Sequence, residues 1–247
     1  MSGHSKWATT KRKKARIDQA RAKVFNRIIR ELTVAARAGG SDPDGNPRLR
    51  AAILKAKAAN MPQKNIDTNI AKGAGELEGV TYTEITYEGY GPGGTAILVD
   101  TMTDNRVRTV AEVRHAFSKN GGNMGEEGSV GWMFKQRGVI TLPKDKIAED
   151  ALFELATENG AEDFDASGDE YEIRVEPEHY HKLVDALQKK GLEPSSAEMS
   201  KLAENMIKVT GEEASRAMEL LEALDDLDDV QNVHTNAEFD PNEIEDL

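Results

Sequence analysis

Apolar residues between positions 21 and 38 recur three or four residues apart, and they are Phe25, Ile28, Ile29, Leu32, Ala35 and Ala36. Residues with this spacing share one side of a helix, so the pattern predicts an amphipathic helix, which Gly39 and Gly40 end. Basic residues fall on the opposite side, and they are Lys23, Arg27, Arg30 and Arg37. One side of the helix can therefore pack while the other presents a cationic stripe.

Two shorter helices are expected next. Asn46 is placed to cap a helix that begins at Pro47 and ends before Met61 and Pro62. A third helix runs from Gln63 to Lys72, directs Ile66 and Ile70 inward and closes at Gly73. Residues 1–78 are therefore predicted to form a basic helical domain.

The pattern changes to strands after the glycine-rich segment 73–79. Residues 82–87 and 95–102 alternate as strands joined by the turn EGYGPGG, and Arg106 to Lys119 has helical spacing. The segment NGGNMGEEG is expected to be a loop, and residues 129–134 a further strand.

Residues 135–205 follow the order strand, helix, strand, strand, helix, strand. This order is the ferredoxin-like unit, and it is complete in itself. A helix at 212–227 and a strand at 230–234 remain, and one helix with one strand cannot bury its own apolar faces.

We therefore expect the C-terminal segment to return and complete the middle domain. The predicted fold class is α+β: an N-terminal helical domain followed by two ferredoxin-like α/β sandwich domains, the last inserted into the middle one. The middle domain is then discontinuous, with residues 79–134 plus 206–247, and residues 135–205 form the insertion.

Charge is divided unevenly along the chain. Residues 1–30 carry ten Lys or Arg against one acid, and residues 1–72 carry 17 against five, whereas residues 73–247 carry 15 against 39. A local positive field of this kind indicates a polyanion partner. We expect nucleic-acid contacts from Lys6, Trp7, Lys11, Arg12, Lys13, Lys14, Arg16, Arg21, Lys23, Arg27, Arg30 and Arg37. A merely solvated lysine-rich surface is the alternative.

Two modes of binding stay open. In the first, the basic N-terminal arm grips phosphates, and Trp7 stacks on a base, without sequence readout. In the second, the helices at 48–60 and 63–72 form a helix-turn-helix whose second helix can reach base edges with Gln63, Lys64, Asn65, Thr68 and Asn69. Binding through the arm draws on more charge than binding through the two helices. For these helices, a simple helical hairpin that supports the arm is favoured over base readout. The acidic tail, with 13 acids against Arg216 from residue 212 onward, is interpreted as a solvated helix face.

Catalytic and metal-binding patterns are weak. Gly89, Gly91 and Gly94 match the dinucleotide fingerprint, but a strand and not a helix follows them. The chain has no cysteine, His179 and His181 point to different sides of a helix, and neither GxSxG, HExxH nor a P-loop occurs. We predict no enzyme, no cofactor, no metal and no small-molecule substrate. The longest apolar run, 96–99, is far too short for a membrane span, and a cytoplasmic location is expected.

Several segments together resemble one known family. They are GHSKW at 3–7, IIRELTVAARAGG at 28–40, NPRLRAAI at 46–53, YEGYGPGGTAI at 87–97 and DNRVRTVAEVRHAFSKNGGNMGEEGSV at 104–130. The chain is similar to the YebC/PmpR family over its whole length. The resemblance implies three domains with the helical one first. Because it begins at residue 2 or 3, it implies a bacterial cytoplasmic member without a transit sequence.

The resemblance also implies a role in gene expression. The family is described as DNA-binding transcriptional regulators, and it includes mitochondrial translational activators and bacterial factors that relieve ribosome stalls at proline-rich stretches. We therefore expect a nucleic-acid-binding regulator with DNA or ribosomal RNA as its partner. Transcription is placed first, action on the ribosome is the close alternative, and a pure protein adaptor explains the acidic body but not the arm.

Overall fold

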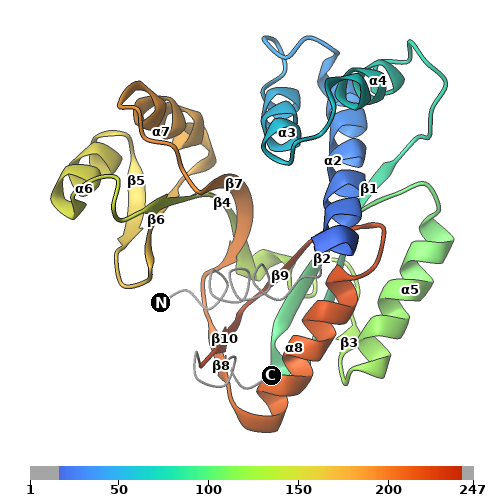
Figure 1. The fold of residues 1–247 in the computed structure, drawn as a ribbon. Helices are drawn as coiled ribbons and strands as arrows, with labels where there is room; N and C mark the ends of the chain where they lie inside the picture. The colour runs from blue at the N-terminus through green and yellow to red at the C-terminus, as the bar shows by residue number, and fades with distance from the viewer. Residues whose placement is uncertain (1–16, 241–247) are drawn as a thin grey trace.

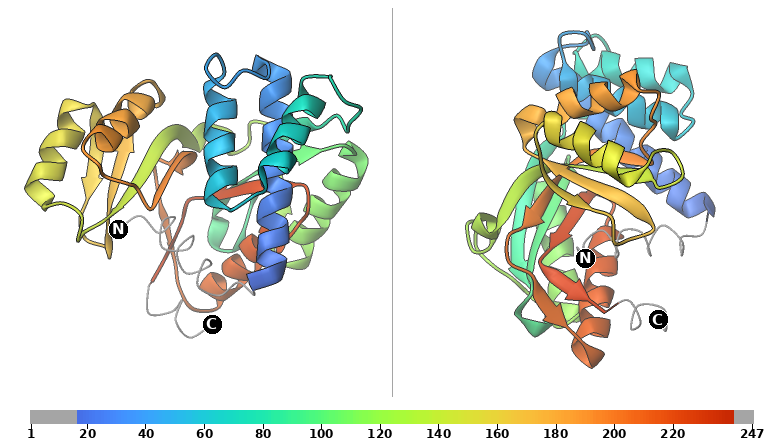
Figure 2. Two further views of the ribbon diagram at one scale, coloured as in Figure 1. Left: turned by 45° about the horizontal axis from the view of Figure 1, so that its top comes forward. Right: turned by 90° about the vertical axis from the view of Figure 1, so that its left-hand side faces the viewer.

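The computed structural model describes residues 17–240, with side chains from residue 22 onward. Three helices come first, and two α/β sandwiches follow (Figure 1). Figures 1 and 2 show the three helices and the second sandwich lying beyond the same end of the first sandwich. The mixed α+β class expected from the sequence is confirmed.

The helical domain consists of α2 (Ile17–Gly39), α3 (Pro47–Ala58) and α4 (Gln63–Gly73). Asn46 caps α3 as predicted, because its side-chain oxygen accepts a hydrogen bond from the Leu49 N–H at 3.1 Å. Its amide donates to the Ala35 and Gly40 carbonyls at 2.8 and 2.9 Å, which ties the start of α3 to the end of α2.

The helices pack through a small apolar core that includes Leu32, Leu49 and Ile66. Helix α4 lies directly against the backbone of α2, since a Cβ atom at Gly73 would lie 2.3 Å from the Thr33 carbonyl oxygen. Only glycine fits at this contact.

The middle sheet is antiparallel and has the order β3-β1-β2-β9. Its strands are β1 (Thr83–Tyr90), β2 (Ala96–Thr103), β3 (Asn123–Met124) and β9 (Val230–Thr235). Helices α5 (Arg106–Lys119) and α8 (Gly211–Asp225) cover one face, where Ile97 and Val99 of β2 pack with Phe117, Leu220 and Val233. The C-terminal helix and strand therefore complete this sandwich.

The strand expected at 129–134 is wrong. This segment forms a short 3-10 turn, η2 (Gly131–Met133), and the fourth strand is instead β3, within the segment expected to be a loop. The buried carboxylate of Glu88 explains the turn, because it accepts hydrogen bonds from the N–H groups of Gly128, Val130 and Gly131 at 2.7 to 2.8 Å. Backbone donors held by a carboxylate are not available to a strand ladder.

The second sandwich has the sheet order β5-β6-β4-β7, which is the ferredoxin-like order expected from the chain. Its elements are β4 (Phe134–Pro143), α6 (Glu149–Glu158), β5 (Ala161–Asp165), β6 (Glu170–Val175), α7 (Pro177–Lys189) and β7 (Ser196–Ala203). Ile140, Leu142, Leu152, Ile173 and Leu183 are fully buried in its own core. This unit therefore has an apolar core separate from that of the middle sandwich.

A parallel pair of short strands, β8 (Ile207–Val209) and β10 (Ala237–Phe239), was not anticipated. Both strands follow residues 135–205 in the sequence. Their residues Val209 and Phe239 are nevertheless buried in the core of the middle sandwich. We propose that residues 135–205 are an inserted domain. The first residue of β4, Phe134, pairs with the last residue of β7, Ala203, so the chain leaves and returns at one place.

Replacing residues 135–202 with a short Gly/Ser linker is expected to leave a folded remainder. Ala203 is retained because it packs with Phe134 against Ala96 and Leu98. Amide hydrogen exchange should show β1, β2 and α5 protected in the shortened chain. Loss of that protection, or unchanged protection of residues 79–134 after removal of residues 206–247, would contradict the insertion.

Candidate nucleic-acid interface

The predicted arm residues lie mostly outside the described part of the chain. They are Lys6, Trp7, Lys11, Arg12, Lys13, Lys14 and Arg16, and the side chain of Arg21 is also outside it. Their role in binding stays a prediction. The structure places the other four, which are Lys23, Arg27, Arg30 and Arg37, on α2.

The cationic stripe of α2 lies against the acidic end of α8. The Lys23 ammonium contacts carboxylate oxygens of Asp225 and Asp226 at 3.1 and 2.9 Å. Arg27 forms an ion pair with Asp225 at 3.0 Å and donates to the carbonyls of Asp225 and Val230 at 2.8 and 2.9 Å. These cations are therefore engaged within the chain and do not face solvent freely.

Arg30 continues this contact one helical turn further along α2. Its guanidinium forms an ion pair with Asp229 at 3.0 Å and also donates to the carbonyl of Asp228. We call Lys23, Arg27 and Arg30 with their aspartate partners the α2–α8 ion cluster. The acidic tail, expected to be only a solvated face, fixes the helical domain to the middle sandwich through this cluster.

Asp229 is the buried centre of the ion cluster, with 1% of its surface exposed. Besides Arg30, its carboxylate accepts hydrogen bonds from Thr109, Arg108 and Thr103 at 2.6, 2.7 and 3.0 Å. Burial disfavours its charged form, but these three hydrogen bonds outweigh burial and lower the pKa of Asp229 below its usual value. One carboxylate thus joins α2, the end of β2 and the start of α5.

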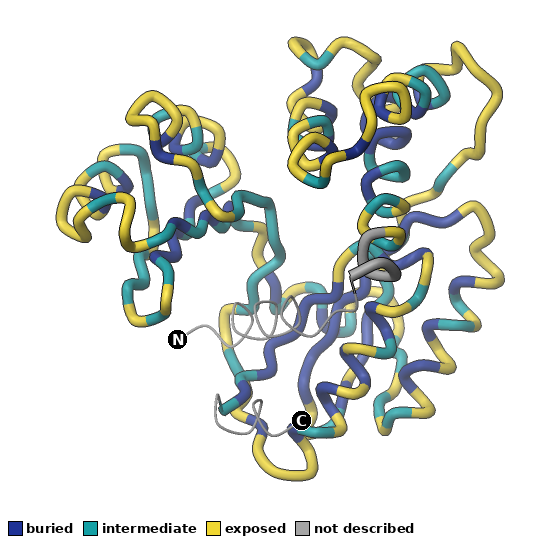
Figure 3. The backbone as a smooth tube through the Cα atoms, in the orientation of Figure 1, coloured by how far each residue is buried: buried dark blue, intermediate teal, exposed yellow. Residues whose placement is uncertain are grey.

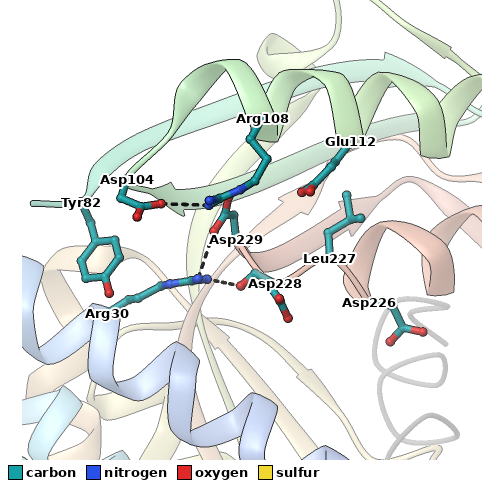
Figure 4. Close-up of a pocket in the computed structure, with 9 residues that line it drawn as sticks. All are labelled: Arg30, Tyr82, Asp104, Arg108, Glu112, Asp226, Leu227, Asp228 and Asp229. Carbon is teal, nitrogen blue, oxygen red and sulfur yellow. Dashed lines mark hydrogen bonds and ion pairs between the residues drawn. The ribbon is translucent and has the colours of Figure 1, made fainter. Parts of the chain in front are cut away.

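A cleft of about 490 Å³ opens above this carboxylate, between α2 and α5 (Figure 4). The guanidinium groups of Arg30 and Arg108 converge on Asp229 from the two helices, and the Tyr82 ring lies 5.6 Å from Arg30. The remaining charged residues that line it are all acids, namely Asp104, Glu112, Asp226 and Asp228. Because both arginines are already neutralised, the cleft does not favour a phosphate.

A second contact holds the helical domain on its other side. Arg48 of α3 binds Glu31 of α2 at 2.7 Å and Glu84 of β1 at 2.6 Å. Hydrogen bonds to Glu31 and Glu84 raise the pKa of the Arg48 guanidinium. Lys55 also approaches Glu198 of β7 at 3.5 Å, although both side chains are largely exposed. The helical domain is therefore attached to the middle sandwich at two separate places.

The inserted domain is attached through Asp100 of β2. Its carboxylate contacts Lys201 of β7 at 2.6 Å, His234 of β9 at 3.1 Å and the Thr86 hydroxyl at 2.6 Å. Burial opposes the charged form, but hydrogen bonds from His234, Lys201 and Thr86 outweigh it and lower the pKa of Asp100. This carboxylate remains ionised in the folded protein under neutral and mildly acidic conditions.

Three of the five side chains suited to reading bases are engaged within α4, whereas Lys64 and Asn65 are exposed. The Gln63 amide donates to Asp67 at 2.7 Å, and the Thr68 hydroxyl donates to the Lys64 carbonyl at 2.6 Å. Asn69 is buried and donates to the Asn65 carbonyl at 2.7 Å. Within residues 22–78, the exposed cations without an ion pair to another described residue are Arg37, Arg50, Lys57 and Lys64. Phosphate contacts are thus better served here than base contacts.

An exposed aromatic residue escaped the sequence analysis. Trp132 is 69% exposed on the turn that Glu88 holds, and its indole N–H donates to the Ser129 carbonyl at 3.3 Å. The Tyr90 hydroxyl donates to the same carbonyl at 3.1 Å. The glycines before Trp132 were the available signal, since they indicate a shaped loop and not a strand.

One group of side chains has metal-ligand spacing among the described residues. Ligand atoms of Glu176, Glu178 and His179 lie within 4.8 Å of one another at the start of α7. A helix N-terminus carries partial positive charge, which opposes cation binding. The glycine-rich turn that matched the dinucleotide fingerprint is followed by β2, so it lacks the helix that holds a pyrophosphate.

Known protein families match both parts of the chain. The model described as "TACO1/YebC protein N-terminal domain" matches residues 5–76, and the model described as "TACO1/YebC second and third domain" matches residues 82–237. The chain belongs to the TACO1/YebC family. The resemblance to YebC proteins drawn from the short segments is thereby confirmed. Within residues 17–240, no helix of this family member is both long enough and apolar enough to cross a membrane.

Relatives match this TACO1/YebC chain over nearly its full length. A protein of Koribacter versatilis named "Probable transcriptional regulatory protein" is 53% identical, covering 100% of this chain and 99% of its own. One of the same name from Acidithiobacillus ferrooxidans is 54% identical, covering 99% of this chain and 97% of its own. The crystal structure of a conserved hypothetical protein from Aquifex aeolicus has a TM-score of 0.84 and 45% identity, covering 92% of this chain and 94% of its own.

Substituting Asp229→Asn is expected to destabilise the protein by about 3 kcal/mol, because it leaves Arg30 and Arg108 without their shared counter-charge. Asp228→Asn is the matched control, since the exposed Asp228 contributes only its backbone carbonyl to Arg30. The control should stay within about 0.5 kcal/mol of the parent protein. Urea unfolding measures both, and equal effects of the two substitutions would contradict a central role for Asp229.

The contribution of Asp100 to stability is expected to disappear in acid. A carboxyl whose pKa is lowered on folding stabilises the protein above its unfolded value, about 3.9, and the stabilisation is lost as pH falls through the folded value. The difference in unfolding free energy between the parent protein and Asp100→Asn should therefore shrink as the pH falls below about pH 4. Asp145→Asn, at an exposed site, is the control. If the difference in unfolding free energy between the parent protein and Asp100→Asn does not change with pH, the expectation is refuted.

Proposed function

We propose that this protein is a cytoplasmic, nucleic-acid-binding regulator of gene expression, without catalytic turnover, and that its N-terminal arm holds phosphates. The observation that carries the proposal is the charge of residues 1–30, which combine ten basic residues with one acid in a chain of net charge −12. A localised positive field attracts a polyanion even where the net charge is negative. The acidic remainder favours contact through residues 1 to about 72.

The α2–α8 ion cluster narrows the set of residues that would bind nucleic-acid phosphates. Lys23, Arg27 and Arg30 already have carboxylate and carbonyl partners, and displacing these partners would leave buried acids without a counter-charge. The proposed contacts therefore fall on Lys6 and the basic run from Lys11 to Arg16, with Arg37 exposed at the other end of α2. Helix α2 then serves as the support from which the arm extends.

Transcription is the first form of this proposal, because the full-length relatives are named as probable transcriptional regulatory proteins. Binding to ribosomal RNA is the second form, because phosphate contacts without base contacts serve RNA as well as DNA. The engaged side chains of Gln63, Thr68 and Asn69 favour neither a specific DNA sequence nor a specific RNA. A pure protein adaptor leaves the arm unexplained.

The arm is tested by replacing Lys11, Arg12, Lys13 and Lys14 with alanine. Each lost phosphate contact lowers the magnitude of the slope of log K against log[salt] by about 0.9 on duplex DNA and about 0.7 on single strands. The four substitutions should therefore reduce its magnitude by up to about 3.6 or 2.8, with little change in sequence preference. Binding of the parent protein and the variant to duplex DNA and to ribosomal RNA, each at several salt concentrations, gives these slopes.

Two further variants serve as controls for the arm. Arg27→Ala removes one positive charge that is already paired, so it should lower stability and leave the salt slope unchanged. A Gln63→Ala/Asn65→Ala variant should bind all sequences as before, whereas base readout would cost about 1 to 3 kcal/mol on one preferred sequence. An unchanged slope in the arm variant on both ligands would mean that the basic N-terminus is only a solvated surface.

A further inference from the structure

Trp132 is an exposed aromatic side chain that lies between two buried anchors. Val130 is fully buried and Phe134 is 9% exposed, and both pack with Ala96 and Leu98 of β2. Strand β2 is itself almost entirely buried (Figure 3). Trp132 is nevertheless 69% exposed. Its exposure is therefore not the result of a loosely attached segment.

The turn that carries Trp132 is fixed by several contacts. The buried Glu88 carboxylate holds it through the N–H groups of Gly128, Val130 and Gly131. Gly128 has a φ of +84°, at which a side chain would be strained, and a Cβ atom at Gly131 would lie 3.0 Å from a Glu88 carboxylate oxygen. A fixed turn lowers the entropic cost of binding a partner.

A second aromatic ring, that of Tyr90, lies beside this turn. The Trp132 indole N–H and the Tyr90 hydroxyl both donate to the Ser129 carbonyl, at 3.3 and 3.1 Å, so the polar atoms of the two rings lie close together. Tyr90 is 38% exposed. Single exposed apolar residues are common, but two rings held at one carbonyl form a larger aromatic surface. Trp and Tyr are among the residues that contribute most to binding at protein interfaces.

The unpaired charges on this turn are negative. Glu126 and Glu127 are exposed, and neither has an ion pair with another described residue. The segment 120–134 contains no Lys or Arg. Lys135 and Arg137, which follow it, are already paired with other glutamates. Charge complementarity therefore favours a positively charged partner.

Arginine matches both properties of this surface. Its guanidinium stacks on aromatic faces, Trp gives the strongest cation–π attraction, and the positive charge suits the two glutamates. A nucleic-acid base could also stack on Trp132, but Glu126 and Glu127 would repel the phosphates beside it. The observations therefore favour a protein segment over a nucleic acid.

We propose that Trp132 and Tyr90, with Glu126 and Glu127, form a docking surface for an arginine-bearing, positively charged segment of another protein. This inference goes beyond the proposed function, because it concerns the middle sandwich and a protein partner and does not involve the N-terminal arm. The rings supply the stacking surface, and the glutamates supply the charge attraction.

The test measures binding of the full-length protein to two dye-labelled Gly/Ser peptides, one with four arginines and one with four lysines. The parent protein should bind the arginine peptide more tightly, because a planar guanidinium stacks on a ring and an ammonium does not. Trp132→Ala should weaken binding of the arginine peptide by about two- to five-fold and remove most of this preference. Trp132→Phe should keep part of the preference, and Tyr90→Ala should have a smaller effect than Trp132→Ala. Fluorescence anisotropy gives the affinities, and the melting temperature shows that each variant is folded.

Matched variants separate the ring from the charge. Phe153→Ala removes another exposed ring, 53% exposed on α6, and should leave the preference for arginine unchanged. Glu126→Gln/Glu127→Gln should weaken binding of both peptides by the same factor. This effect should exceed that of Glu219→Gln/Glu222→Gln, which removes two exposed acids from α8.

Three results would overturn the inference. They are equal binding of the two peptides by the parent protein, equal effects of Trp132→Ala and Phe153→Ala, and weaker binding of single-stranded oligouridine by Trp132→Ala with peptide binding unchanged. The third result would assign the surface to nucleic acid. If Trp132→Ala does not fold, an undiminished preference for arginine in Trp132→Phe overturns the inference instead. None of these results bears on the basic arm, so the proposed function would stand.

Discussion

The arrangement of the domains depends on carboxylates at the end of α8 and just after it, which bind the basic side of α2. Asp225, Asp226 and Asp229 face Lys23, Arg27 and Arg30 at 2.9 to 3.1 Å, and Asp229 is almost completely buried. A buried charge without its partner is costly, so each side of this contact constrains the other. The contact brings together residues about 200 positions apart and places α2 beside β9 and the start of α5.

Much of the fold follows from local patterns. The three helices, the Asn46 cap and the ferredoxin-like order could be predicted because spacing, caps and turn residues act over a few positions. The strand at 129–134 could not, because Glu88 determines that segment from another part of the chain. Strands β8 and β10 were missed for a similar reason: each has three residues and pairs with a strand that lies far from it in the sequence.

The candidate site shows the same division between local and distant information. The sequence shows the basic stripe of α2 but not what the stripe contacts. Cations that face water and cations that pair with Asp225 have the same spacing along the sequence. The acidic residues from 212 onward were interpreted as solvated because the partners of Asp225, Asp226 and Asp229 lie near the other end of the chain. Charge patterning thus predicts that opposite charges exist, and only the fold shows which of them meet.

The uneven distribution of charge along the chain leaves two kinds of cation in the described residues. Some are paired with carboxylates, and others are exposed without an ion pair. Lys23, Arg27 and Arg30 of α2 are paired with the buried carboxylates of Asp225 and Asp229, so a phosphate would have to offset the cost of leaving those carboxylates unpaired. The exposed cations of the helical domain, Arg37, Arg50, Lys57 and Lys64, carry no such cost, because none has an ion pair with another described residue. In the proposed complex, nucleic-acid phosphates, whose attraction is weakened by salt, would therefore compete poorly for Lys23, Arg27 and Arg30 and bind more readily at Arg37 and Arg50. The acidic body thereby determines which basic residues are left to bind.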